Sequence, residues 1–155
     1  MADLRAVFEG VGFSDVQTYI QSGNVVFSSE RTADLESLIS EAIKRNYAWD
    51  VPVLVKTAPE IEAIVATCPF SKERKEKSYF AILNTEPATE RISETALITY
   101  PGEVFVITKK CVYIYSERRA ADSKLSNNFF ERKLKVAATT RNFRTLTKLV
   151  DIAAG

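Results

Sequence analysis

The 155-residue sequence contains no histidine and only two cysteines, and both scarcities limit the chemistry available to it. Without histidine, the chain lacks the general base of Ser/His/Asp and Cys/His nucleophile arrangements and also the commonest metal ligand. Cys68 and Cys111 lie far apart, so neither a disulfide framework nor a cysteine-based zinc site is expected. Glycine-rich nucleotide loops of the two common types are also missing. The sequence therefore predicts no catalytic residues and no metal site, identifies no cofactor, and favours a binding protein over an enzyme.

Long apolar runs are scarce as well. The longest are strand-sized and are interrupted by charges, so we expect no membrane-spanning segment and no membrane partner. Residues 1–5 are typical of the start of an amphipathic helix and not of a secretory signal. With 46% hydrophobic and 26% charged residues, the composition is that of a globular protein, for which a cytoplasmic location is the default expectation.

Charge is distributed unevenly, although the net charge is only +1. Residues 1–108 carry 10 basic and 16 acidic side chains, whereas residues 109–155 carry 11 basic and 4 acidic ones. The cationic C-terminal third suggests an acidic partner, either a phosphate-bearing molecule or a nucleic acid.

The first half of the chain, which we place at residues 1–70, predicts the element order α-β-β-α-β before a short further helix. Apolar residues at helical spacing predict helices over residues 2–11 and 32–46. Alternating residues around a turn at 21–24 predict a β-hairpin. Residues 51–56 predict a strand, and Pro52 suggests that this strand begins at a sheet edge.

The second half, residues 78–155, follows a mixed-charge run at residues 71–77 that predicts a solvated linker. Its predicted elements are a strand at 78–83, a helix at 89–98, strands at 103–108 and 111–116, a helix at 125–134, a strand at 136–139 and a final helix. The order β-α-β-β-α-β is that of a ferredoxin-like sheet with two helices on one face. The first half matches this order if its opening strand is missing. We therefore predict an α+β fold of two ferredoxin-like units in tandem, followed by a C-terminal helix.

The strongest candidate site is the segment leading into the last helix. Apolar residues within 139–149 recur at helical spacing and predict a helix that begins near Thr140. Free N–H groups at a helix N-terminus, with arginines beside them, suit an anion. The predicted ligand-binding residues here are Thr139, Thr140, Arg141, Asn142, Arg144 and Lys124. The alternative is structural: the polar residues cap the helix, and a carboxylate holds Arg141 in a network.

Two other groups of residues have competing structural explanations. Ser22 and Asn24 flank a glycine in a predicted hairpin turn, where glycine and asparagine supply positive φ angles. Tyr113, Tyr115 and Phe105 lie near basic residues, and aromatic residues in that setting stack bases in RNA-recognition domains. Core packing is the favoured explanation for these three aromatic residues.

Three patches resemble a known bacterial family. They are residues 19–27 (Tyr-Ile-Gln-Ser-Gly-Asn-Val-Val-Phe), residues 123–127 (Ser-Lys-Leu-Ser-Asn), and residues 139–142 with Thr145, Lys148 and Leu149. Together, and in the same order along the chain, these patches resemble domain-of-unknown-function family 1697. The resemblance covers essentially the whole chain. The resemblance implies a duplicated, ferredoxin-like α+β fold without an established activity, and it adds Ser22 and Asn24 to the predicted ligand-binding residues.

Members of that family usually open with an apolar strand and a glycine-rich loop, which this sequence lacks. An N-terminal sheet without its first strand would expose an unpaired edge, and such edges invite pairing with another chain. The resemblance therefore leads us to expect a homo-oligomer that forms through this edge.

Taken together, the sequence predicts a cytoplasmic binding protein for an anionic or phosphate-bearing ligand near the start of the last helix. The main alternative is a nucleic-acid-binding protein that uses the basic C-terminal third through phosphate contacts. A weaker alternative is an enzyme whose reaction the sequence does not identify.

Overall fold

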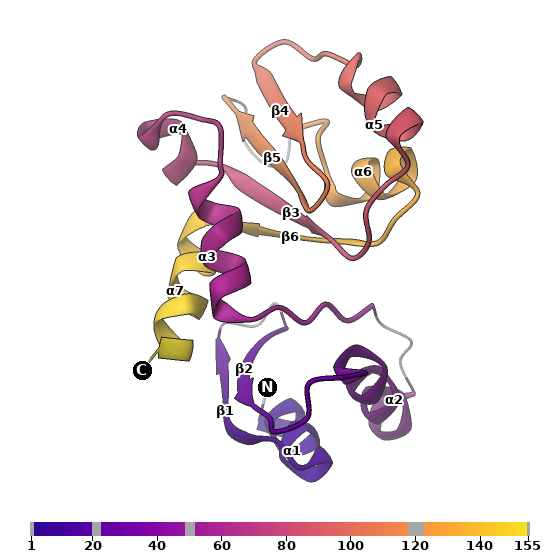
Figure 1. Ribbon diagram of the computed structural model, residues 1–155, viewed down its shortest axis with the longest axis vertical. Coiled ribbons are helices and arrows are strands. Elements are labelled where there is room, and N and C mark those ends of the chain that lie inside the picture. The colour runs from indigo at the N-terminus through magenta and orange to yellow at the C-terminus, as the bar shows by residue number, and fades with distance from the viewer. Residues whose placement is uncertain (1, 20–22, 49–51, 118–122, 155) are drawn as a thin grey trace. The chain divides into compact units, whose positions relative to one another are not determined.

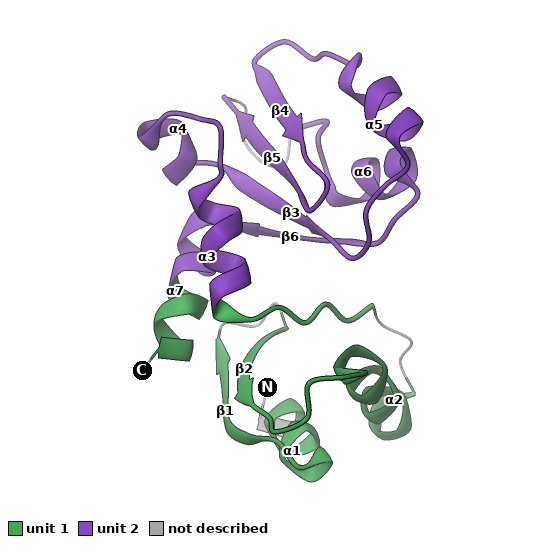
Figure 2. Ribbon diagram, viewed as in Figure 1, with its two compact units in different colours: residues 1–58, 148–155 green, residues 59–147 purple. Residues whose placement is uncertain are grey.

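The structure is a computed structural model, and it describes residues 2–19, 23–48, 52–117 and 123–154. The chain divides into two compact units, residues 1–58 with 148–155 and residues 59–147 (Figure 2). The division falls before residues 71–77, where the sequence predicted a linker. Residues 148–155 return to the first unit, although the prediction placed them in the C-terminal half.

The first unit contains two helices and a two-stranded antiparallel sheet (Figure 1). Its elements are α1 (Ala2–Val11), β1 (Ser14–Tyr19), β2 (Asn24–Ser28) and α2 (Leu35–Tyr47). The rings of Phe8, Phe13 and Phe27 contact one another in its core, with the Phe13 and Phe27 centroids 4.4 Å apart. Both helices and the hairpin agree with the prediction.

The strand predicted at residues 51–56 does not form over the described part of that segment. Pro52 has no N–H to donate to a neighbouring strand. The Val55 N–H donates instead to the Glu36 carboxylate, 3.3 Å away on α2. The Glu36 side chain thus accepts the hydrogen bond that the Val55 N–H would otherwise donate to a neighbouring strand. The prediction of a strand is wrong for residues 52–56.

The second unit is built on a four-stranded antiparallel sheet with strand order β4-β5-β3-β6. Its elements are α3 (Ala58–Ala66), α4 (Lys72–Glu76), β3 (Tyr79–Leu83), α5 (Thr89–Ala96), β4 (Glu103–Ile107), β5 (Cys111–Ser116), α6 (Asn127–Leu134), β6 (Ala138–Asn142) and the start of α7 (Phe143–Ala154). The part of α7 from Lys148 onward belongs to the first unit. From β3 to β6, the element order is the predicted β-α-β-β-α-β. Together the two units form a mixed α+β fold.

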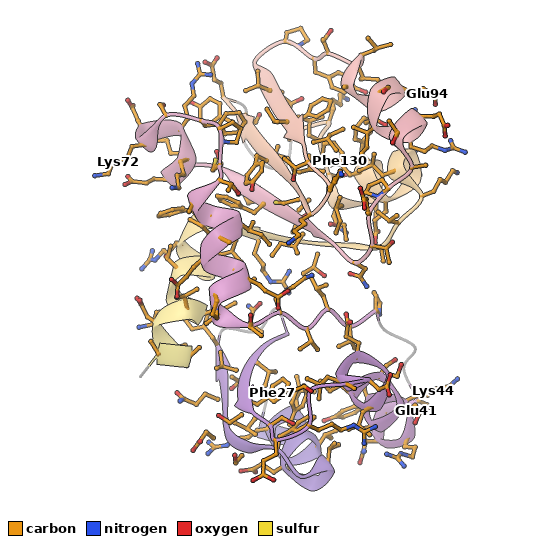
Figure 3. All side chains as sticks on the ribbon, in the orientation of Figure 1. Phe27, Glu41, Lys44, Lys72, Glu94 and Phe130 are labelled. Atoms are coloured by element: carbon orange, nitrogen blue, oxygen red, sulfur yellow. The ribbon has the colours of Figure 1, made fainter. Side chains whose placement is uncertain are left out.

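The two faces of this sheet are covered by different elements. On one face, Ala81 and Val112 belong to a core that includes Phe129 and Phe130 of α6. Figure 3 labels Phe130 in this core. On the other face, the buried Tyr113 hydroxyl donates to the Ile64 carbonyl of α3, 2.7 Å away. The sheet is therefore a middle layer, and α3 contacts the face opposite α6.

Residues 72–76, within the charged run predicted as a linker, form the short helix α4. The Ser71 hydroxyl accepts from the Arg74 N–H (3.4 Å), which caps the N-terminus of the helix. At the other end, the Ser78 hydroxyl donates to the Arg74 carbonyl (2.6 Å). Most residues of this segment are exposed, as their mixed charges predicted, and the two flanking serines supply partners for backbone groups of the helix.

Cys68 is half-buried and Cys111 is fully buried, and both are free thiols. Burial raises the pKa of the Cys111 thiol far above its ordinary value, because the charged thiolate is poorly solvated there. Among the described residues, no helix combines the length and the apolar character needed to cross a membrane.

Candidate functional site

The residues predicted to bind an anion lie mainly at the junction between β6 and α7. β6 is an edge strand that pairs with β3, so that Arg141 lies opposite Phe80 and Asn142 opposite Tyr79. The helix begins at Phe143, later than the predicted start near Thr140. Asn142 caps it, because its Oδ1 accepts from the Thr145 N–H at 2.8 Å. Pairing with β3 keeps residues 139–142 extended and delays the helix.

Strand geometry divides the predicted cluster between two faces of the sheet. Because side chains alternate along a strand, Thr139 and Arg141 share one face, whereas Thr140 and Asn142 share the other. The Thr140 hydroxyl donates to Asn127 Oδ1 (2.7 Å), and Asn127 Nδ2 donates to the Ala138 carbonyl (2.9 Å). The Thr140 side chain thus belongs to a network that ties the start of α6 to β6.

Arg141 carries the charge closest to this junction. Its side chain is half-buried, and its Nη1 donates to the Thr140 carbonyl at 2.8 Å. Burial lowers the pKa of Arg141 because desolvation disfavours the charged form, yet a guanidinium stays protonated in proteins. A fixed cation in partly dry surroundings attracts an anion more strongly than one in bulk water.

The two remaining cations of the predicted site lie in different places. Arg144 is exposed in the first turn of α7, directly after the Asn142 cap. The Lys124 N–H donates to the Glu103 carboxylate (3.3 Å), which belongs to β4 at the opposite edge of the sheet. Three strand spacings of about 4.8 Å separate β4 from β6. The structure therefore does not bring Lys124 together with Arg141.

The Lys124 main chain is part of a separate polar cluster around Glu103. This buried carboxylate accepts from the Ser116 hydroxyl (3.1 Å), from the Ser123 hydroxyl and from the Lys124 N–H. The carboxylate therefore accepts three hydrogen bonds, and two of these hold Ser123 and Lys124 beside β4. No pattern in the sequence pointed to this role of Glu103.

Of the two hairpin residues, Ser22 lies outside the described part of the chain. Asn24 begins β2 in the first unit, where it is buried and its Nδ2 donates to the Tyr19 carbonyl at 3.3 Å. It also pairs with Tyr19 in the sheet register. These contacts support the structural explanation of Asn24 as a residue that closes the hairpin.

The base-stacking arrangement proposed for Tyr113, Tyr115 and Phe105 does not form. Tyr113 is buried beneath α3, with its hydroxyl also 2.9 Å from Thr67 Oγ1. Phe105 lies on the opposite face of the sheet, where its ring packs 5.3 Å from that of Phe130. Core packing is thus confirmed for Tyr113 and Phe105.

Sequence reasoning missed Ser78, which fixes the surroundings of this junction. This fully buried residue donates its hydroxyl to the Arg74 carbonyl (2.6 Å) and its N–H to the Lys75 carbonyl (3.1 Å). Its own carbonyl accepts from the Phe143 N–H at 3.3 Å. The end of α4 and the start of α7 therefore meet at Ser78. The serines flanking the charged run were the available signal for a capped helix.

Within residues 2–19, 23–48, 52–117 and 123–154, no three histidine, cysteine, aspartate or glutamate side chains are grouped so as to hold a metal ion. The junction offers cations, hydroxyls and backbone N–H groups, which are partners for an anion.

Comparison with known proteins agrees with the mixed α+β class. A family described as a protein of unknown function, DUF1697, matches residues 1–113, and the chain belongs to this family. The matched residues end before β6, so Arg141 and Asn142 lie outside them. Comparison with curated proteins finds no match.

A solved structure has a similar fold. It is that of the conserved bacterial protein SP0830 from Streptococcus pneumoniae, with a TM-score of 0.77 and 21% sequence identity. The similarity covers 100% of this chain and 89% of that chain. At this level of identity, the likeness shows a shared fold.

Proposed function

We propose that this protein binds a small anionic, phosphate-bearing ligand at the junction between β6 and α7. The observation that carries the proposal is the half-buried, partly desolvated guanidinium of Arg141, one residue before the cap of α7. Arg144 adds a second cation in the first turn of the helix. A phosphate group would accept charge-assisted hydrogen bonds from both arginines.

Two backbone N–H groups at the start of α7 already have acceptors within the protein, which limits the N–H groups that a ligand could use. The Phe143 N–H already donates to Ser78, and the Thr145 N–H donates to the Asn142 side chain. We therefore assign the Arg144 N–H to the ligand, where the positive end of the helix dipole also favours an anion. The Thr139 hydroxyl, on the same face as Arg141, is a further donor in this proposal. Lys124 and Thr140 have no part in it.

Thermal unfolding in the presence of different anions tests the proposal. Pyrophosphate, orthophosphate and a nucleoside triphosphate would be compared with chloride at equal ionic strength. A ligand that binds only the folded state stabilises it by about 2.7 kcal/mol at 100 times its Kd. We expect the phosphate compounds to raise the unfolding midpoint of the wild type and of Lys124→Ala alike. Identical midpoints in all anions would contradict the proposal.

We further propose that the second unit is ferredoxin-like and that the first unit is an incomplete copy of it. The antiparallel order β4-β5-β3-β6 and the β-α-β-β-α-β element order support the first part. The α-β-β-α order of the first unit matches an internal portion of that pattern. An experimental structure with a different strand order would contradict this assignment.

We also propose that the protein is cytoplasmic and self-associates through its N-terminal sheet. Over the described residues, β1 and β2 pair only with each other, so each presents one open edge. Open edges are sites at which another strand can pair. Sedimentation velocity at micromolar concentration is expected to show a dimer, and a monodisperse monomer would contradict self-association. Cell fractionation tests the location.

A further inference from the structure

We infer that the proposed anion site is one end of a larger surface that binds single-stranded nucleic acid. The inference rests on the proposed function and deepens it by naming the ligand class. We call this region the Ser78 surface, because the contacts of Ser78 assemble it. It comprises Lys72, Arg74, Lys75, Lys77, Tyr79 and Arg144.

The contacts of Ser78 bring these residues together from two distant parts of the sequence. The pairing of Tyr79 with Asn142 continues one step further, since the Phe143 N–H donates to the Ser78 carbonyl. The Ser78 N–H and hydroxyl hold the last turn of α4 beside them. Cations of α4 and α7 therefore share one neighbourhood.

The charge of this surface is predominantly positive. The α4 segment contributes four basic side chains and two acidic ones, Glu73 and Glu76, and Arg144 adds a further cation. Glu73 lies 3.8 Å from the Lys77 ammonium, but both side chains are well exposed, so this pair adds little attraction. Lys77 thus remains accessible to phosphate. A row of phosphates is the complementary partner of such a surface.

An exposed aromatic ring distinguishes this surface from a simple basic patch. Tyr79 is 39% exposed and is the first residue of β3, directly beside Asn142 in the sheet. Separately, the Arg74 guanidinium of α4 lies 4.9 Å from the centre of the Tyr115 ring. Proteins that bind single strands combine a cationic track with aromatic rings on which bases stack. In a duplex, neighbouring base pairs stack on one another and cover the base faces on which the Tyr79 ring would stack.

This location differs from the one that the sequence suggested for nucleic acid. The sheet face with Tyr113 is covered, and Lys109 of the C-terminal third lies 3.5 Å from a Glu86 carboxylate oxygen. The Ser78 surface draws instead on α4, which the prediction treated as a linker.

Fluorescence anisotropy with labelled 12-nucleotide RNA and DNA single strands, and with the matching duplex, tests the inference. Between 50 and 200 mM salt, we expect single strands to bind in preference to the duplex and to lose affinity steeply. The double variant Lys77→Gln with Arg144→Gln should bind about ten-fold more weakly and reduce the salt slope by roughly 1.4, since each single-strand phosphate contact contributes about 0.7. Tyr79→Leu should weaken binding about five-fold or more and leave the slope unchanged.

The matched control is the double variant Arg132→Gln with Lys133→Gln, which removes the same two charge types from exposed positions of α6. We expect the salt slope of this control to equal that of the wild type. Circular dichroism checks that every variant is folded. Equal losses in the control and in the Lys77 and Arg144 variant would overturn the assignment to the Ser78 surface.

A parallel titration with pyrophosphate separates this inference from the proposed function. If pyrophosphate binds but no oligonucleotide does, the nucleic-acid inference fails and the small-anion site stands. If neither binds, both fail. Binding to anionic phospholipid vesicles in place of oligonucleotides would also overturn the inference, because lipid headgroups then account for the charge.

Discussion

Replacement of Phe130 by alanine is expected to lower the free energy of unfolding by about 3–5 kcal/mol. The Phe130 side chain is fully buried, and its ring lies 5.0 Å from that of Phe129 and 5.3 Å from that of Phe105. Its removal would leave a cavity between α6 and the sheet, which the surrounding helix and strands fill only in part. Chemical denaturation followed by far-ultraviolet circular dichroism measures the change.

Leu97 offers a matched control for this substitution. It is also a large apolar residue, but it is 83% exposed at the end of α5. Leu97→Ala is therefore expected to change the free energy of unfolding by no more than about 0.5 kcal/mol. Similar losses for both variants would show that α6 does not pack on the sheet as described.

Replacement of Arg141 by glutamine is expected to weaken the binding of pyrophosphate by about 10- to 150-fold. Hydrogen bonds to charged groups contribute about 1.5–3 kcal/mol, and each 1.4 kcal/mol corresponds to a tenfold change in Kd. Glutamine keeps a polar side chain but removes the charge and the fork of donors. Isothermal titration calorimetry measures the loss directly.

Two further variants separate binding from structure at this position. Arg141→Lys keeps the charge without the planar fork, so it should lose less affinity than Arg141→Gln. Arg132→Gln removes an exposed arginine from α6 and should bind like the wild type. If Arg141→Gln lowers the free energy of unfolding but binds pyrophosphate normally, Arg141 has the structural role that the sequence left open as an alternative.

The parts of the fold that the sequence predicted well depend on local patterns. Helical spacing located α1 and α2, and alternation with turn residues located the hairpins. The strand predicted around Val55 failed because its N–H bonds to Glu36, a residue distant in the sequence. The helix α4 was missed because its own charges are mixed, whereas its ends are defined by Ser71 and Ser78.

The predicted site shows the same limit. Arg141, Asn142 and Arg144 are near one another simply because they are close in the sequence. Lys124 was included on the resemblance and on its charge, but strand order places its main chain at the other edge of the sheet. Ser78 and α4 join this junction through the hydrogen bond between Ser78 and Phe143, two residues that are far apart in the sequence.

The most direct test of the anion site is a nuclear magnetic resonance titration of ¹⁵N-labelled protein with pyrophosphate. We expect the largest shifts at the backbone amide of Arg144 and the side-chain Nε of Arg141, with saturation at a single site. We expect no shift at the amide of Lys124. Shifts concentrated around Lys124 and Glu103, or no saturable shifts at all, would contradict an anion site at the start of α7.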